Sequence, residues 1–535
     1  MEGAPTAPLP RSLQASPGRA LVLPLLFTAG LLAVGLCPPV RQAPRVFWSF
    51  LVAASILLAW NGALLLVVLR TRRVLTLAIA LRKQHYVQAC AHTAILLYWG
   101  WYFRPVYESA HLIVAQLCFA YAFDMLRSWS RRDSYTLGFG PCPIVLSTNL
   151  FLWFKPDWFF LQFLMVAVGF AAKEFIRWHK DGRQAHIFNP SSFALTVMSL
   201  ALILTGASDI TWGRDIAITQ FYPPHMYLFL FLIALPGQFL FGVTTMTLSA
   251  VLTTYVCGLA YYAATGTYYF FDSHVPIAVF LGMHLLFTDP STSPRSELGR
   301  LIAGALYGAS SMLLYGWLGH QGVPAFYDKL LQVPMLNLSV RWIDRVARSP
   351  RLRAVDPSRI GRSLAPRQRH LGYMTIWAGV FVALSMVDGL GDRHRGQWLP
   401  FWEGACRAGH PRACEHAANL QQILCDAGSG WACNEVGLRT IAEDRAGGAA
   451  RGAAAQAADS FERGCRLGCL PACRNVRRGA GDADPLERAQ PTLADYPILV
   501  RGSKGPVTDR TPAGLYAKAC EQGWPDTCGR VGLSR

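Results

Sequence analysis

The sequence predicts an all-α fold: a polytopic transmembrane helical bundle followed by a C-terminal αα-hairpin solenoid with disulfides. Apolar stretches predict the bundle, because about thirteen of them approach the roughly 20 residues that a helix needs to span a bilayer. They fill residues 20–391, and a repeated cysteine motif predicts the solenoid in residues 395–535. Residues 1–19 are expected to be a cytoplasmic segment, and the first apolar stretch a retained crossing rather than a cleaved signal peptide.

The predicted crossings follow one another at short intervals. They are 20–38, 47–69, 86–103, 109–126, 136–153, 157–177, 190–206, 225–242, 247–264, 274–288, 299–318, 326–344 and 371–391. The second contains no charged residue at all. The fifth is interrupted near its start by Gly138, Gly140, Pro141 and Pro143. A proline kink explains this, but so does a broken or re-entrant helix at the edge of a polar site, since such backbone must be sheltered from lipid.

Arginine and lysine residues lie mainly in alternate loops between the predicted crossings. The formal charge is +18, although only 15% of the residues are charged. The basic loops are 70–83, 127–132, 177–183, 295–300 and 341–369. Positive loops stay in the cytoplasm, so the N-terminus is expected there and the C-terminal domain on the opposite side. This accounts for the charge without nucleic-acid binding, and it predicts a multi-pass protein of the lipid bilayer.

The C-terminal region repeats one cysteine template four times: CRAGHPRAC, CDAGSGWAC, CRLGCLPAC and CEQGWPDTC. Each copy reads cysteine, two residues, glycine, three residues, alanine or threonine, cysteine. The flanking stretches are typical of helices, and the fixed glycine stands where a helix ends in a left-handed C-cap. Each copy is therefore predicted to be the turn of an αα-hairpin, and stacked hairpins form a solenoid.

The cysteines of each template are eight positions apart, which lets a tight turn bring two helix ends together for a disulfide. The predicted pairs are Cys406 with Cys414, Cys425 with Cys433, Cys465 with Cys473, and Cys520 with Cys528. Zinc sites compete as an interpretation, but they favour closer cysteines and nearby histidines. Disulfides need an oxidising compartment, which again places this region outside the cytoplasm. Cys469 lies outside the template and is expected to be unpaired.

This region resembles the cysteine-rich Sel-like repeats, relatives of the tetratricopeptide repeats. The resemblance implies a domain that docks a protein partner, here a periplasmic one. The chain departs from the family in its spacing, because the first cysteines of successive copies are irregularly separated. The stretch 475–510 is expected to be an irregular insert.

Two proline turns and a later polar segment stand out in the middle of the chain. The first turn runs from His186 through Phe188, Asn189 and Pro190, and the second contains Thr288, Asp289, Pro290 and Ser293-Pro294. The polar segment begins at Asn337. Together they resemble the NqrB/RnfD family, the membrane subunits of flavin-containing electron-transport complexes. The resemblance covers about residues 140–348 and implies a subunit of a membrane oxidoreductase or ion-translocating complex, working with other membrane electron-transport subunits.

The resemblance implies FMN or another flavin as cofactor, with His186, Asn189 and Asp289 at its edge. Asn189-Pro190 is also a good start for a helix, and a helix N-terminus with free N–H groups binds anions. Both a purely structural cap and a cofactor contact therefore fit. The family attaches FMN to a threonine in a context that this chain lacks. Thr244 and Thr245 instead match another family turn, so a bound flavin is expected to be non-covalent.

Haem is not expected, although His92, His111 and His284 lie within predicted crossings. A single histidine inside a membrane helix is more often a hydrogen-bonded structural residue, and no ligand signature accompanies these three. Two further hypotheses remain beside electron transport. One is a non-redox membrane scaffold or transporter that has lost the flavin. The other is a maturation factor whose repeats grip a secreted product.

Overall fold

The computed structural model describes residues 11–15, 17–180, 183–359, 363–410, 412–445, 452–478, 485–500, 509–525 and 527–531. These residues are mostly helical, as predicted. The chain divides into two compact units. Unit 1 comprises Met1–Thr254 and Ile277–Ala383, and unit 2 comprises Tyr255–Pro276 and Leu384–Arg535. A segment of the predicted bundle, Tyr255–Pro276, thus belongs with the cysteine-rich region.

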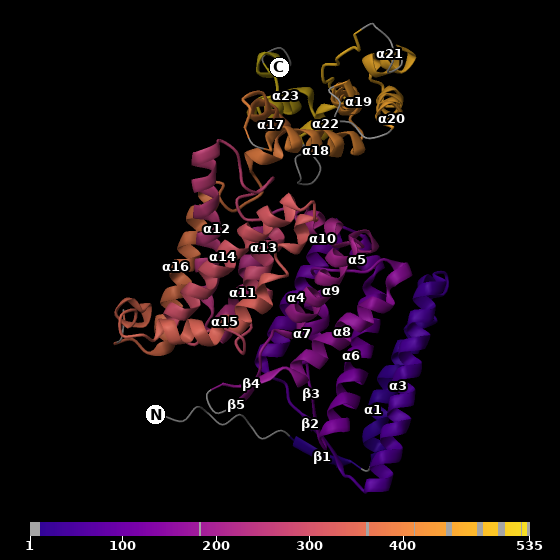
Figure 1. The fold of residues 1–535 in the computed structure, drawn as a ribbon, viewed down its shortest axis with the longest axis vertical. Coiled ribbons are helices and arrows are strands. Elements are labelled where there is room, and N and C mark those ends of the chain that lie inside the picture. Colours follow the sequence, from indigo (N-terminus) through magenta and orange to yellow (C-terminus); the bar gives the residue numbers. More distant parts are fainter. Residues whose placement is uncertain are drawn as a thin grey trace. The chain divides into compact units, whose positions relative to one another are not determined.

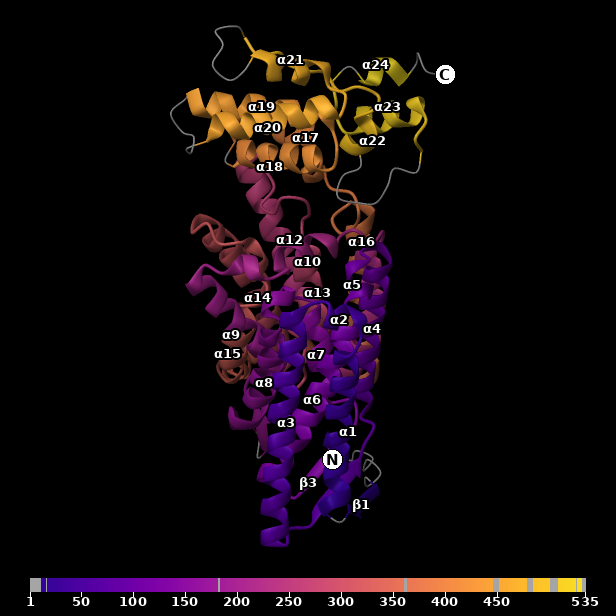
Figure 2. The same ribbon diagram turned by 90° about the vertical axis from the view of Figure 1, so that its right-hand side faces the viewer.

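Unit 1 is a helical bundle. Its longer helices are α1 (Pro17–Gly35), α3 (Pro44–Thr71), α4 (Lys83–Tyr102), α6 (Ala110–Arg131), α8 (Phe160–Phe175), α9 (Pro190–Thr205), α11 (Met226–Phe241), α14 (Glu297–His320), α15 (Gln332–Ala347) and α16 (Pro366–Met386). Helix α12 (Thr244–Thr265) begins in this unit. Helices α1, α3, α6 and α8 lie side by side (Figures 1 and 2) around a core that contains Phe50, Trp129 and Phe170.

Two small sheets depart from the predicted all-α fold. Strand β2 (Leu75–Ile79) pairs antiparallel with β1 (Arg11–Ala15) and parallel with β3 (Ser134–Leu137). Strands β4 (Arg177–Lys180) and β5 (Arg183–His186) form a hairpin. All five strands come from loops or from the N-terminal segment, whose backbone N–H and C=O groups need partners that a helix does not supply.

The prediction of about thirteen crossings is not matched by helix length. Among the described residues, α3, α12 and α14 are long and apolar enough to cross a membrane by length and composition. Four shorter apolar segments accompany them: Arg19–Gly35, Pro190–Thr205, Met226–Phe241 and Ile277–Leu286. The remaining predicted crossings either contain charged or polar residues or are broken.

Two predicted crossings are broken by recognisable local features. The fifth consists of β3 and then α7 (Pro141–Asn149), a helix of 9 residues that starts at the glycine- and proline-rich interruption. The tenth consists of α13 (Ile277–Leu281) followed by a π-helical turn, Gly282–Leu286. Turns of π-helix are rare and often lie at functional sites. Hydropathy alone does not reveal such breaks.

Unit 2 contains the predicted hairpins. Its helices are α17 (Leu399–Arg407), α18 (Ala413–Asp426), α19 (Gly430–Arg445), α20 (Ala453–Arg466), α21 (Leu470–Arg478), α22 (Tyr496–Leu499), α23 (Pro512–Glu521) and α24 (Thr527–Val531). The four disulfides join the predicted pairs, and Cys469 is free. The template glycines 409, 428, 468 and 523 all have positive φ between 74° and 103°. The predicted left-handed C-caps are therefore confirmed.

Candidate functional site

Unit 1 contains a polar cavity of about 430 Å³. Its wall is formed by the N-terminal ends of three helices, α4, α7 and α9, together with the end of α8 and the loop after the π-helical turn. The side chains that matter below are Arg82, His92, Lys173, His186, Asp289 and Ser291. The resemblance selected three residues for a cofactor edge, and all three, including Asn189, line this one cavity.

His186 and Asp289 lie 103 positions apart in sequence and meet through Ser291. The Ser291 hydroxyl lies 2.8 Å from His186 Nε2 and donates to Asp289 Oδ1 at 2.6 Å. Asp289 Oδ2 lies 3.4 Å from the same His186 nitrogen. In a serine-hydrolase triad the carboxylate and the serine bind different ring nitrogens of the histidine. Here both face Nε2, so the three residues position the loop and do not form a nucleophilic triad.

Asn189 has the predicted cap role, and its other polar atoms are also occupied. Its side-chain oxygen accepts from the backbone N–H groups of Ser191 and Ser192 at 3.0 and 3.1 Å. Its amide nitrogen donates to the Leu286 carbonyl at 3.1 Å, and its backbone N–H donates to Asn337 at 3.0 Å. The first amides of α9 are therefore satisfied internally. The hydrogen bonds of Asn189 thus link α9, α15 and the π-helical turn.

Two cations face the cavity. Arg82 precedes α4, and Lys173 lies in the last turn of α8. Within the described residues, neither has a carboxylate within ion-pair distance. The single carboxylate of the wall, Asp289, is already engaged. Burial acts to raise the pKa of Asp289, but hydrogen bonds from His186 and Ser291 outweigh it and lower the pKa to about 2. The wall therefore carries an excess of positive charge, which suits an anion.

His92 adds an unused hydrogen-bonding side chain to the wall. It is 1% exposed, and neither of its ring nitrogens has a hydrogen-bond partner among the described residues. Leaving a buried polar group unpaired costs about 1–3 kcal/mol. A ligand in the cavity would offer this histidine the partner that the chain does not.

Other residues singled out in the sequence lie elsewhere. Thr244 and Thr245 begin α12 and do not line the cavity; Thr245 donates to Glu297 at 2.8 Å. His284 Nδ1 lies 2.7 Å from the Phe280 carbonyl, and its ring packs near Trp377. The described residues contain no group of three or more histidine, cysteine or acidic side chains that could hold a metal ion.

Lys173 and Ser147 were not among the predicted site residues. The sequence did contain a signal for the first, because Lys173 and Glu174 are adjacent charges inside the predicted crossing 157–177. Ionisable residues within an apolar segment commonly mark a functional or polar cavity. Ser147 donates to Ser191 at 2.6 Å and links α7 to α9 across the cavity wall. The interrupted start of the fifth crossing lies at the edge of this cavity, since Gly140 and Pro143 line it.

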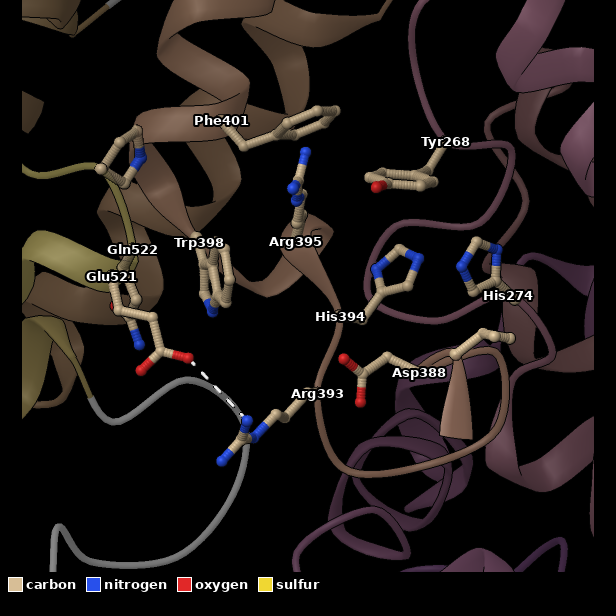
Figure 3. A pocket seen from close by; sticks show the side chains of 13 residues that line it. Tyr268, His274, Asp388, Arg393, His394, Arg395, Trp398, Phe401, Glu521 and Gln522 are labelled. Atoms are coloured by element: carbon tan, nitrogen blue, oxygen red, sulfur yellow. Dashed lines mark ion pairs between the residues drawn. The ribbon is translucent and has the colours of Figure 1, made fainter. Parts of the chain in front are cut away.

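Unit 2 contains a second cavity, of about 710 Å³ (Figure 3). Tyr268, His274, His394 and Phe401 form one side of it, and Arg393 pairs with Glu521 at 3.9 Å on the other. Burial, and to a smaller extent the proximity of His274, lowers the pKa of His394 to about 3, so this imidazole stays neutral at ordinary pH.

Comparisons of the whole chain with family models, curated proteins and solved structures found no match.

Proposed function

We propose that the protein is an integral membrane electron-transport subunit resembling the NqrB/RnfD proteins, with a flavin held non-covalently in the unit 1 cavity. One observation supports this most: the motif residues His186, Asn189 and Asp289 line a single cavity together with two cations that lack carboxylate partners. The resemblance predicts that these sequence-distant residues lie together, and their position in one wall supports the proposal.

The residues of the wall fit a flavin mononucleotide. A flavin supplies one- and two-electron transfer when bound. Lys173 and Arg82 would balance the charge of its phosphate, and His92 would donate or accept a hydrogen bond at a buried polar edge. The cavity volume of about 430 Å³ lies within the range of small-ligand sites, about 300–1,000 Å³. Thr244 and Thr245 lie outside this wall, so covalent attachment there forms no part of the proposal.

Exposed apolar side chains support a membrane location for unit 1. Leu204, Leu313 and Trp48 are 84%, 73% and 63% exposed on α9, α14 and α3. Large apolar surfaces on a soluble protein are usually buried against a partner. Lipid would cover these side chains here. The predicted polytopic bundle would then include helices shorter than the roughly 20 residues that a full crossing needs.

We place the N-terminus in the cytoplasm and unit 2 in the periplasm of a bacterial inner membrane. The strands β1 to β5 lie toward one end of unit 1 (Figure 1). Basic residues adjoin them in the chain: Arg73 precedes β2, Arg127 lies near the end of α6, and Arg132 lies between α6 and β3. That distribution is typical of a cytoplasmic face. Four disulfides in unit 2 favour an oxidising compartment. Other electron-transport subunits would bind unit 1, and a periplasmic protein would dock on unit 2.

The test is to purify the full chain in detergent and to measure visible absorption and the flavin released by acid. Stoichiometric, acid-releasable flavin is expected. Lys173→Gln should weaken flavin binding by about tenfold or more, because a hydrogen bond to a charged group contributes about 1.5–3 kcal/mol. Lys155→Gln is the matched control, since Lys155 stacks on Trp212 and does not line the cavity.

A colourless protein that takes up no added FMN would contradict the proposal. It would favour the alternative function, a non-redox membrane scaffold or transporter with the same bundle. Equal flavin binding by the wild type and Lys173→Gln would instead show that the flavin does not bind in this cavity.

A further inference from the structure

Unit 2 holds part of its own insert as an extended peptide. The segment Pro485–Pro491 lies between α21 and α22 and has no regular secondary structure. Its backbone is bound by side chains of α19 and α21. Asn475 accepts from the Glu487 N–H at 2.7 Å, and the Glu487 carbonyl accepts from Asn475 at 2.9 Å and from Asn434 at 3.1 Å.

The same pattern recurs two residues later. The Ala489 carbonyl accepts from the indole N–H of Trp431 at 3.0 Å. Residues i and i+2 of an extended chain point the same backbone groups in one direction. Side chains of these helices therefore bind the main chain of the segment. A groove that binds main-chain groups recognises an extended peptide independently of most of its sequence.

Three side chains of the segment supply the remaining contacts. Leu486 packs on the apolar cluster of Ile441, Ala457 and Phe461, and Ala489 packs on the main core of unit 2. The Glu487 carboxylate pairs with Arg474 at 2.9 Å and Arg478 at 3.0 Å. Arg488 is exposed. The groove thus selects an apolar residue, then an acidic one, and a small residue two positions further on.

The groove continues beyond the segment. A cavity of about 900 Å³ is lined by Arg488–Pro491 on one side and by Glu403, Glu435 and Arg439 on the other. One carboxylate oxygen of Glu435, Oε1, is buried and has no hydrogen-bond partner among the described residues. The segment therefore fills one part of a longer groove and leaves polar groups beside it unused.

We propose that this groove is a receptor for an extended peptide of a partner protein, in which an apolar residue precedes a carboxylate, and that residues 485–491 are an internal ligand which the partner displaces. A ligand tethered within the chain competes at a high effective concentration, roughly millimolar for a short connection. Partner binding is then suppressed until the partner's peptide outcompetes the segment. The bound segment itself indicates the chemistry of the partner: an apolar residue followed by a carboxylate, in extended conformation. This inference does not depend on a flavin in unit 1.

The test uses the full chain in detergent and a labelled peptide with the sequence PLERAQPT, followed by fluorescence anisotropy. Glu487→Arg replaces the ion pairs with Arg474 and Arg478 by repulsion between like charges. The segment should then leave the groove. Peptide affinity should then rise by about tenfold or more, because the tethered competitor is removed. A peptide with glutamine in place of its glutamate should bind weakly to the same variant. Glu521→Arg is the matched control, because this substitution makes the same change of charge at a residue that does not line the groove.

Absence of peptide binding to Glu487→Arg, with its four disulfides and helicity intact, would overturn the proposal. So would equal affinity of the wild type and Glu487→Arg. A second measurement avoids any folding defect of the variant: in the wild type, saturating peptide should accelerate hydrogen exchange at the Glu487 amide, which donates to Asn475. Unchanged protection of this amide would show that the segment is a permanent part of the fold.

Discussion

At the scale of single residues, Asp289 has the clearest predicted dependence on pH. Its pKa of about 2 lies below the ordinary value of 3.8, so its ionised form stabilises the fold. That stability is fully present above about pH 4 and is lost as the pH falls toward 2. A shift of this size corresponds to about 2 kcal/mol, at about 1.4 kcal/mol per pKa unit.

Asp289→Asn should therefore flatten the fall in melting temperature between about pH 5 and pH 2. The asparagine keeps one oxygen for the Ser291 turn, so the variant removes the titration and preserves the loop. Asp157→Asn is the control, because the Asp157 side chain is 62% exposed and pairs only with an exposed arginine. Parallel profiles for Asp289→Asn and the wild type would show that this carboxylate does not govern the acid limb.

Glu174 has a purely structural role. Its carboxylate is 6% exposed and pairs with Arg127, Arg132 and Arg177 at the junction of α6, α8 and β4. Glu174→Gln removes the carboxylate that these arginines share, while Arg127 keeps its pair with Asp124. The loss of charged hydrogen bonds should cost about 1.5–3 kcal/mol of unfolding free energy. Asp133→Asn removes an exposed partner of Arg73 and should cost less than about 1 kcal/mol. Denaturation of both variants in detergent compares the two costs, and similar losses would contradict this.

The site was predictable only where local sequence carried the information. The proline turns at Asn189 and Asp289 are local motifs, and they identified two of the cavity's edges. Lys173 and Ser291 become part of the same wall only through packing between sequence-distant segments. Nor does the sequence show that the other polar atoms of Asn189 bond to Leu286 and Asn337, because that depends on where these two residues lie in space.

At the scale of elements, each disulfide fastens one hairpin of unit 2. Cys465 and Cys473 close a loop of 8 residues between α20 and α21. Constraining a loop of this length lowers the entropy of the unfolded chain by an amount worth about 2.5 kcal/mol. The double variant Cys465→Ala/Cys473→Ala should lose roughly that much stability. Denaturation followed by near-ultraviolet circular dichroism of the unit 2 tryptophans measures it.

Cys469 provides a control within the same hairpin, since it is free and only partly buried. Cys469→Ala should leave the midpoint of denaturation nearly unchanged. A comparable loss in Cys469→Ala and in the double variant would mean that packing at this turn, and not the covalent link, stabilises the hairpin.

Elements with local signals were predicted well, and elements defined by breaks were not. The spacing of cysteine and glycine fixed the hairpin turns, because a left-handed C-cap and an adjacent disulfide both depend on neighbouring residues. The hydropathy of 274–288 hid the π-helical turn at Gly282–Leu286. The strands were missed because β1, β2 and β3 pair across long stretches of sequence and have no repeated alternation to mark them.

At the scale of the whole molecule, loops that are distant in sequence meet in pairs in unit 1. Loops 72–82 and 132–140 join at the end with the strands, where Thr76 and Arg73 contact Asp133. Loops 150–159 and 206–212 contact each other, and the backbone N–H of Trp212 donates to the Trp153 carbonyl at 2.8 Å. The basic loops 70–83 and 127–132 thus meet at one end of the bundle, which the proposed topology requires.

The proposed topology predicts which thiols a membrane-impermeant reagent reaches in intact spheroplasts. After reduction, Cys406 and Cys528 of unit 2 should be labelled without permeabilisation, because they would face the periplasm. Ser363→Cys supplies the matched cytoplasmic control: it is exposed, lies in the basic stretch 341–369, and should react only after permeabilisation. Labelling of Ser363→Cys in intact spheroplasts, with Cys406 and Cys528 protected, would invert the orientation. It would also remove the oxidising compartment that the four disulfides need.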